Sequence, residues 1–142
     1  MLFKRVSRTA AEQVFIVAQN VSGSTVTAGY AVVFDVGSSV NGVRVTKASA
    51  TDLQAFAGVA DADIANSAYG LIQVYGYRSS IYIYASTGSS ASGDNLTAVA
   101  QWGMTPATGA GTAKAFGFLC EAITASSSSQ YFTTAKAFIR AL

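Results

Sequence analysis

Asp61 and Asp63 stand one residue apart and form the acidic pair that comes nearest to a metal site in this chain. Calcium in proteins takes about six to eight oxygen ligands. The pair lacks both a third carboxylate and a downstream glutamate that would bind in a bidentate manner. We therefore expect a solvated turn between strands, and neither a metal nor any other cofactor.

The residues needed for nucleophilic or acid–base catalysis are also scarce. The 142 residues include no histidine, which excludes Ser-His triads, Cys-His pairs and histidine zinc sites. Cys120 is the one cysteine, so an internal disulfide is excluded, and its apolar neighbours predict a buried small hydrophobic residue. The seven carboxylates lack the aromatic and polar surroundings of a sugar cleft, and no phosphate-binding glycine loop is present. We do not expect an enzyme.

Aromatic and basic residues leave two binding hypotheses to weigh. Trp102 is the single tryptophan, and it either stacks on a sugar or base or packs within the protein. Arg44, Arg78 and Arg140 are interleaved with aromatic residues, as in some proteins that bind single-stranded nucleic acid. The net charge of +2 is too small and too scattered to attract a polyanion, so no nucleic-acid partner is expected.

Composition predicts an unusually apolar surface. Hydrophobic residues make up 51% of the chain and charged residues 11%, whereas a typical soluble domain has about 25% charged residues. No apolar run reaches the roughly 18 residues of a membrane span, and the first residues do not form a secretory signal, so no membrane partner is expected. Either the chain buries much of its surface against other subunits, or a monomer is covered by Ser, Thr and Gly.

Short apolar bursts, separated by Gly, Ser, Asn and Asp, indicate an all-β protein. We expect a compact single-domain β-barrel or sandwich over residues 13–142, preceded by an extended N-terminal arm over residues 1–12. The strands are expected at residues 14–18, 25–36, 56–60, 71–77, 81–85, 95–100, 115–124 and 131–142.

Four tyrosines mark the stretch 55–84, where a hairpin around 78–80 is expected to join two strands. In each strand the alternation places aliphatic residues on one side and tyrosines on the other. A tyrosine buries a large ring and keeps its hydroxyl in water, so this second side suits a subunit interface; the alternative is the rim of the same core. The candidate interface residues here are Tyr75, Tyr77, Tyr82 and Tyr84, with Trp102 added.

The N-terminal arm is the other candidate contact. Two apolar residues stand beside basic ones at the start of the chain, and an exposed phenylalanine gains little there unless it docks on a neighbour. A short helix over residues 7–13 is a further expectation, because Ser7 could cap it. The candidate contact residues of the arm are Leu2, Phe3, Lys4, Arg5 and Arg8.

Five fragments, in their order and spacing over about residues 20–125, are similar to a known family. They are NVSG at 20–23 with VTAGYAV at 26–32, AGVA at 57–60, GLIQVYG at 70–76, GDNL at 93–96 and AFGFLCEA at 115–122. Together they resemble the small capsid decoration, or cement, proteins of tailed bacteriophages. Those proteins have a compact β-rich domain, often called a β-tulip, and commonly form trimers on the outer shell.

The resemblance implies a structural virion protein on the outer surface of a phage head. Its partners would be the major capsid protein and further copies of itself as a homotrimer, with the arm reaching a neighbouring subunit and the tyrosines lining a contact. The alternative is a trimeric virion fibre or tail component, or a host-surface adhesin domain, whose loops, for example residues 87–95, bind glycans.

Overall fold

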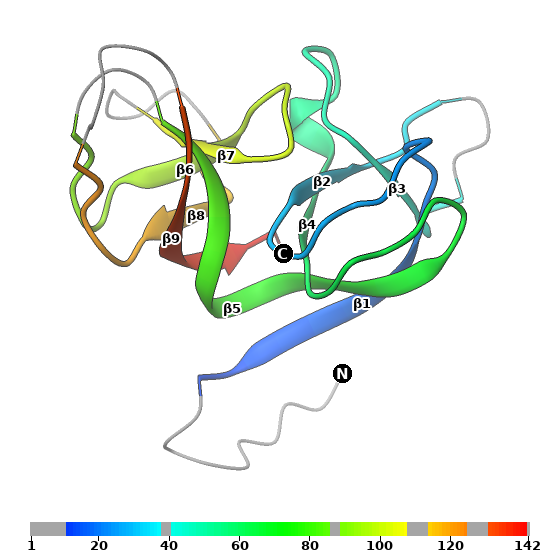
Figure 1. Cartoon of the computed structure of the whole chain (residues 1–142), viewed down its shortest axis with the longest axis horizontal. Coiled ribbons are helices and arrows are strands. Elements are labelled where there is room, and N and C mark those ends of the chain that lie inside the picture. Colours follow the sequence, from blue (N-terminus) through cyan, green and yellow to red (C-terminus); the bar gives the residue numbers. More distant parts are fainter. Residues whose placement is uncertain (1–10, 38–40, 86–88, 108–113, 125–130, 142) are drawn as a thin grey trace.

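Nine strands and one short 3-10 helix make up the computed structural model of the chain, which describes residues 11–37, 41–85, 89–107, 114–124 and 131–141 (Figure 1). β5 is much the longest strand, with 17 residues. The elements are β1 (Gln13–Asn20), β2 (Ala31–Phe34), β3 (Arg44–Thr46), η1 (Leu53–Ala55), β4 (Phe56–Ala60), β5 (Tyr69–Ala85), β6 (Asn95–Ala98), β7 (Met104–Pro106), β8 (Gly117–Leu119) and β9 (Tyr131–Arg140). The expected all-β, barrel-like fold is confirmed.

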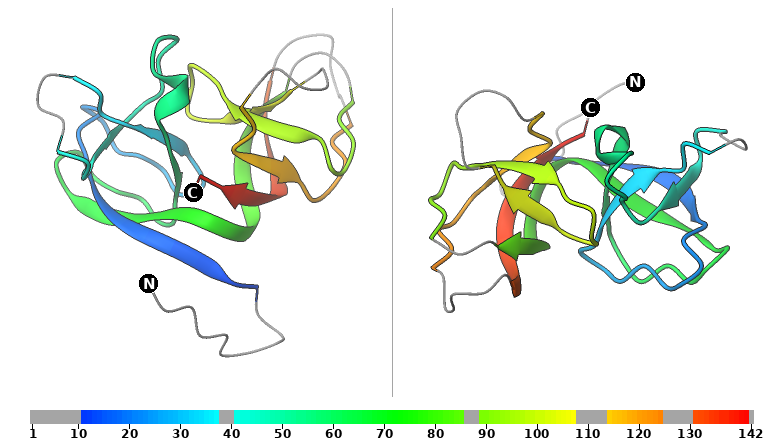
Figure 2. Two further views of the ribbon diagram at one scale, coloured as in Figure 1. Left: turned by 180° about the vertical axis from the view of Figure 1, so that it is seen from behind. Right: turned by 90° about the horizontal axis from the view of Figure 1, so that it is seen from above.

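The strands close into two rings that share β5. The first ring runs β1-β3-β2-β4-β5 and closes because β1 also pairs with β5. The second runs β5-β7-β6-β8-β9 and closes because β9 also pairs with β5. Figure 2 shows the two rings as adjacent lobes, seen from above, with β5 belonging to both. Closure leaves few strand edges open, which suits a chain with little surface charge.

Each ring encloses its own apolar core. The first core includes Ala18, Val32, Val45 and Ile72, contributed by four of the strands of its ring. The second core has larger side chains, and its members are Ala31, Phe56, Val59, Ile81, Ile83, Ala85, Leu96, Ala98, Met104, Leu119, Ile123, Ala135, Ala137 and Ile139. Because this list includes residues of β2 and β4, the second core extends over the outside of the first ring and joins the two lobes.

β4 divides the two cores, since all five of its residues are buried. Phe56 and Val59 face the second core, whereas Ala57 and Ala60 face the first. The change of side occurs at Gly58, which has φ +145°. A Cβ at Gly58 would collide with the carbonyl oxygen of Gln73 on β5, so only glycine fits this close approach.

The predicted hairpin around residues 78–80 is wrong, because β5 continues through this point as one strand. The segment is instead a bulge, where the pairing with β9 shifts between Arg78 and Ile81. Arg-Ser-Ser lacks the Gly or Asn that tight hairpin turns favour, and β9 arrives from the end of the chain to pair with both halves of β5.

Other boundaries also needed correction. The helix expected at residues 7–13 is contradicted at its end, because Gln13 begins β1 and residues 11–12 have no regular structure; residues 7–10 lie outside the described part. The strands expected at 25–36 and 115–124 shrink to β2 and β8. β7 is not among the expected strands; it ends at Pro106, which lies beyond the pairing of β7 with β5.

Candidate interaction surfaces

A polar network holds β5 where it passes from one ring to the other. Arg78 donates from Nη1 to Asp61 Oδ1 at 2.9 Å and from Nη2 to the Asp61 carbonyl oxygen at 3.0 Å. The same Nη1 lies 3.3 Å from Oε1 of Gln73, whose side chain is fully buried. Gln73 Nε2 in turn donates to the carbonyl oxygens of Gly76 and Tyr77. Because every partner lies on β5 or directly after β4, the network fixes the path of the shared strand.

Tyr82 lies beyond this point and contacts the first ring. Its ring meets Tyr30 edge to face, with centroids 4.8 Å apart, and Tyr30 stacks on Trp102 at 5.3 Å. Lys47 Nζ lies 5.8 Å from the centroid of the Trp102 ring. Tyr30, Tyr82 and Trp102 are all half-buried. Trp102 thus packs on another aromatic ring, and together these four residues form a surface that we call the aromatic cluster.

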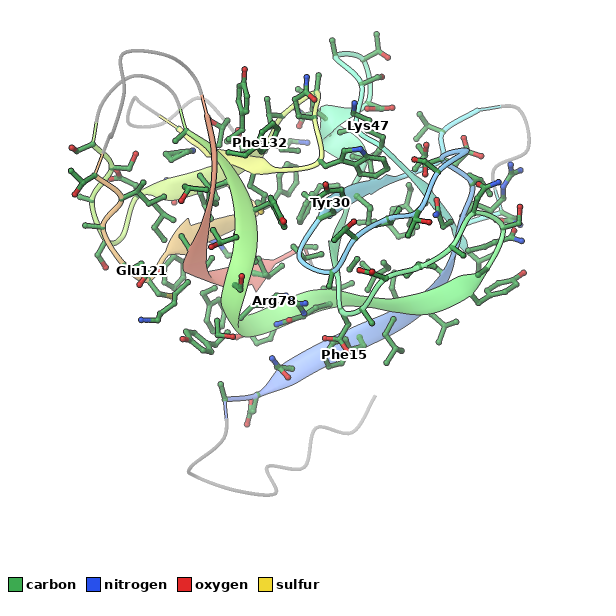
Figure 3. All side chains as sticks on the ribbon, in the orientation of Figure 1. Phe15, Tyr30, Lys47, Arg78, Glu121 and Phe132 are labelled. Atoms are coloured by element: carbon green, nitrogen blue, oxygen red, sulfur yellow. The ribbon has the colours of Figure 1, made fainter. Side chains whose placement is uncertain are left out.

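Tyr84 extends the aromatic surface along β5. Its ring centroid lies 5.0 Å from that of Phe132 on β9, and Phe132 is 47% exposed. Gly103, directly after Trp102, fits between them, since a Cβ there would lie 3.2 Å from the Tyr84 nitrogen and 3.4 Å from Phe132 Cε1. The aromatic cluster and Phe132 therefore lie on one side of the molecule, where Figure 3 labels Tyr30, Lys47 and Phe132.

Tyr75 belongs to a different group of rings. It meets Phe138 edge to face at 5.1 Å, Phe138 stacks on Phe118 at 5.3 Å, and the Arg140 guanidinium lies 5.8 Å from the Phe118 centroid. Tyr77 is half-buried and pairs with Phe138 across the ladder between β5 and β9.

Within one chain, the four tyrosines thus fall into separate groups of rings. The aliphatic residues that were expected to face inward, Ile72, Val74, Ile81 and Ile83, are buried. The tyrosines of the two halves nevertheless pack against different rings. The bulge at 78–80 explains the split, because the alternation of sides is not continuous through it. Their assignment to a subunit interface stays a prediction. The arm residues Leu2, Phe3, Lys4, Arg5 and Arg8 lie outside the described residues.

The acidic pair has structural partners. Asp61 binds Arg78, and Asp63 Oδ1 accepts the backbone N–H of Ala28 at 2.8 Å, so Asp61 is not the purely solvated turn residue that we expected. In the described part of the chain, no group of three or more His, Cys, Asp or Glu side chains is placed to hold a metal ion. The same part contains no helix long and apolar enough to cross a membrane.

Cys120 and Glu121 lie between β8 and β9. Cys120 is half-buried, so the predicted core position is wrong; partial burial and the nearby Glu121 charge raise the pKa of its thiol. Glu121 accepts the Lys136 backbone N–H at 2.8 Å and lies 3.1 Å from Lys136 Nζ. These bonds lower the pKa of Glu121 and raise the pKa of Lys136.

A further apolar surface was missed by the sequence reasoning. Among the described residues, β1 and the first half of β5 form a ribbon whose outer side carries Val17, Leu71 and Tyr69, which are 59%, 45% and 63% exposed. Phe15 shares this side and is half-buried. Ile16 and Ala18 point inward to the first core, which fixes the direction of their neighbours. We call Phe15, Val17, Tyr69 and Leu71 the ribbon surface.

One signal in the sequence could have found the ribbon surface. Residues 13–20 and 69–77 contain no Asp, Glu, Lys or Arg, even though alternate residues must face outward in each strand. An outward side without charge is the feature that marks an interaction surface. Knowing that these two segments pair with each other required the structure.

Comparisons with known proteins found the fold but no family. No family model matches the chain, and no curated protein matches it. Among solved structures, the chain is similar to the head fiber gp8.5 N base in bacteriophage phi29, with a TM-score of 0.54 and 18% sequence identity. The match covers 92% of this chain and 96% of that one. At this identity the likeness shows a shared fold.

Proposed function

We propose that the chain is a structural protein of a bacteriophage virion, located on the outer surface of the head. The observation that carries this proposal is the shared fold with the head fiber N base of phage phi29, which extends over nearly the full length of both chains. The resemblance of the five sequence fragments to phage decoration proteins is a separate argument for the same location. The scarcity of catalytic residue types agrees with a structural role.

The preferred role is that of a decoration, or cement, protein. In this role the chain forms a homotrimer, binds the major capsid protein and holds neighbouring shell subunits together. Apolar burial contributes about 25 cal/mol per Å² before the costs of association. Several attachment points on one oligomer would convert modest contacts into stable binding, because the second contact forms at high effective concentration.

A fibre is the second candidate, and the identity of the structural neighbour favours it, since that protein is the base of a head fiber. A fibre base needs to attach to the head and need not stabilise it. The two roles therefore differ in their effect on the shell, which makes them separable in one experiment.

The test uses heads that lack this protein, prepared from the phage that encodes it. The purified chain is added, binding is measured by co-sedimentation, and DNA release on heating is measured with and without it. A cement protein binds and raises the temperature of DNA release, whereas a fibre base binds and leaves this temperature unchanged. If the chain neither binds heads nor occurs in purified virions, the virion assignment is wrong.

A further inference from the structure

We propose that the β1–β5 ribbon is the surface through which two copies of this chain contact each other. The proposal names the self-contact of the virion protein proposed above, and it rests on that function only for its biological setting. Of the seven large hydrophobic residues that are exposed in the described part of the chain, three belong to the ribbon surface: Val17, Tyr69 and Leu71. Such a concentration on one pair of strands is typical of an interaction site.

The open edge of β1 is a second observation. Beyond its pairing with β5, β1 pairs with β3 only at Gln19 and Asn20, so residues 13–18 have no second partner strand among the described residues. Gln19 N–H donates away from β5, to Val43, while Asn20 N–H donates toward the β5 side, to Ala68. Because these directions alternate along a strand, the N–H and C=O groups of Phe15 and Val17 face the open edge. An apolar edge of this kind favours the addition of another chain.

The absence of charge indicates a second copy as the occupant. Contacts around a symmetry axis bring a residue close to its own equivalent, so a charge there would repel itself. Residues 13–20 and 69–77 carry no charged side chain, although the rest of the chain contains nine basic and seven acidic residues. In Figure 3, Phe15 lies on the far side of β5 from Tyr30 and Phe132, which leaves the aromatic cluster for other contacts.

The test places a charge on the ribbon and on a matched site elsewhere. Val17→Lys changes a residue that is 59% exposed, and Val36→Lys changes one that is 56% exposed and lies after β2, outside the ribbon surface. The mass of the full chain is measured in solution by sedimentation over a range of concentrations, in the absence of phage heads. Circular dichroism checks that each variant folds. If Val17→Lys does not fold, Leu71→Glu replaces it as the ribbon variant.

We expect the wild type to associate and Val36→Lys to behave like it. Val17→Lys should raise the dissociation constant by roughly tenfold or more, since one charge is buried without a partner. Hydrogen exchange at Phe15 and Val17 should be slow in the oligomer and fast in this variant.

A wild type that stays monomeric, or folded ribbon variants that associate like Val36→Lys, would overturn the proposal. A third outcome would also overturn it: removal of residues 1–10 gives fast hydrogen exchange at Phe15 and Val17 but leaves the oligomeric mass unchanged. In that case the N-terminal segment of the same chain, and not a second copy, would occupy the open edge of β1. Head binding is measured separately, so a failure of the virion assignment leaves the self-contact result intact.

Discussion

Replacing Arg78 with methionine tests whether the polar network holds the shared strand. The Arg78 side chain is 13% exposed and bonds to Asp61, Gln73 and the Ser80 carbonyl oxygen. Asp61 is 42% exposed, so losing this ion pair costs only about 0.5–1 kcal/mol. Leaving Oε1 of the buried Gln73 without this donor costs about 1–3 kcal/mol more. We expect Arg78→Met to lower the free energy of unfolding by about 1.5–4 kcal/mol.

Urea unfolding followed by circular dichroism measures this change, and Arg140→Met is the matched control. Arg140 is exposed, lies 3.4 Å from Asn95 Oδ1 and contacts Phe118, so its loss should cost less than about 1 kcal/mol. Because β5 belongs to both rings, Arg78→Met should still unfold in a single transition. If it loses no more stability than Arg140→Met, the network does not hold the strand and the reasoning fails.

Two further predictions concern Gly58 and Glu121. Gly58→Ala should destabilise the chain by several kcal/mol or prevent folding, because the added Cβ would meet the Gln73 carbonyl oxygen. The control is Gly93→Ala, where φ is +95° and no atom lies within 4 Å of the added Cβ, so this change should cost only about 1 kcal/mol. Thermal unfolding compares the two variants. The lowered pKa of Glu121 means that its contribution to stability is present above the ordinary value of 4.5 and is lost as pH falls through the lowered pKa. Glu121→Gln should therefore unfold slightly more easily than wild type at neutral pH and equally at low pH; a constant difference in Tm from pH 7 to the acid limit would contradict this.

Local patterns were enough to predict the fold class. The strand at 56–60 was predicted with the same bounds as β4, and that at 14–18 lies within β1, because both are short apolar runs followed by polar residues. The continuity of β5 was not predictable, since it depends on pairing with β9, more than forty residues later in the chain. A bulge and a turn have similar local sequences, and the partner strand decides between them.

The candidate surfaces were less predictable than the fold. Tyr82 and Tyr84 were correctly expected to lie opposite Ile81 and Ile83, because plain alternation holds over that half of β5. Beyond the bulge, alternation no longer predicts which tyrosines lie together. Trp102 stacks on Tyr30, from a segment more than seventy residues earlier, and only the closing of the rings brings them together.

The arrangement of the surfaces bears on how a decoration protein would work. To hold neighbouring shell subunits together, each oligomer must contact its own copies and the shell at the same time. In Figure 3, Phe15 of the ribbon surface and Tyr30 of the aromatic cluster lie on opposite sides of β5. In the proposed arrangement the ribbon surface binds another copy of the chain, and the aromatic cluster remains available to the shell. Because β5 contributes Leu71 to the ribbon surface and Tyr82 to the aromatic cluster, one shared strand would connect the two contacts.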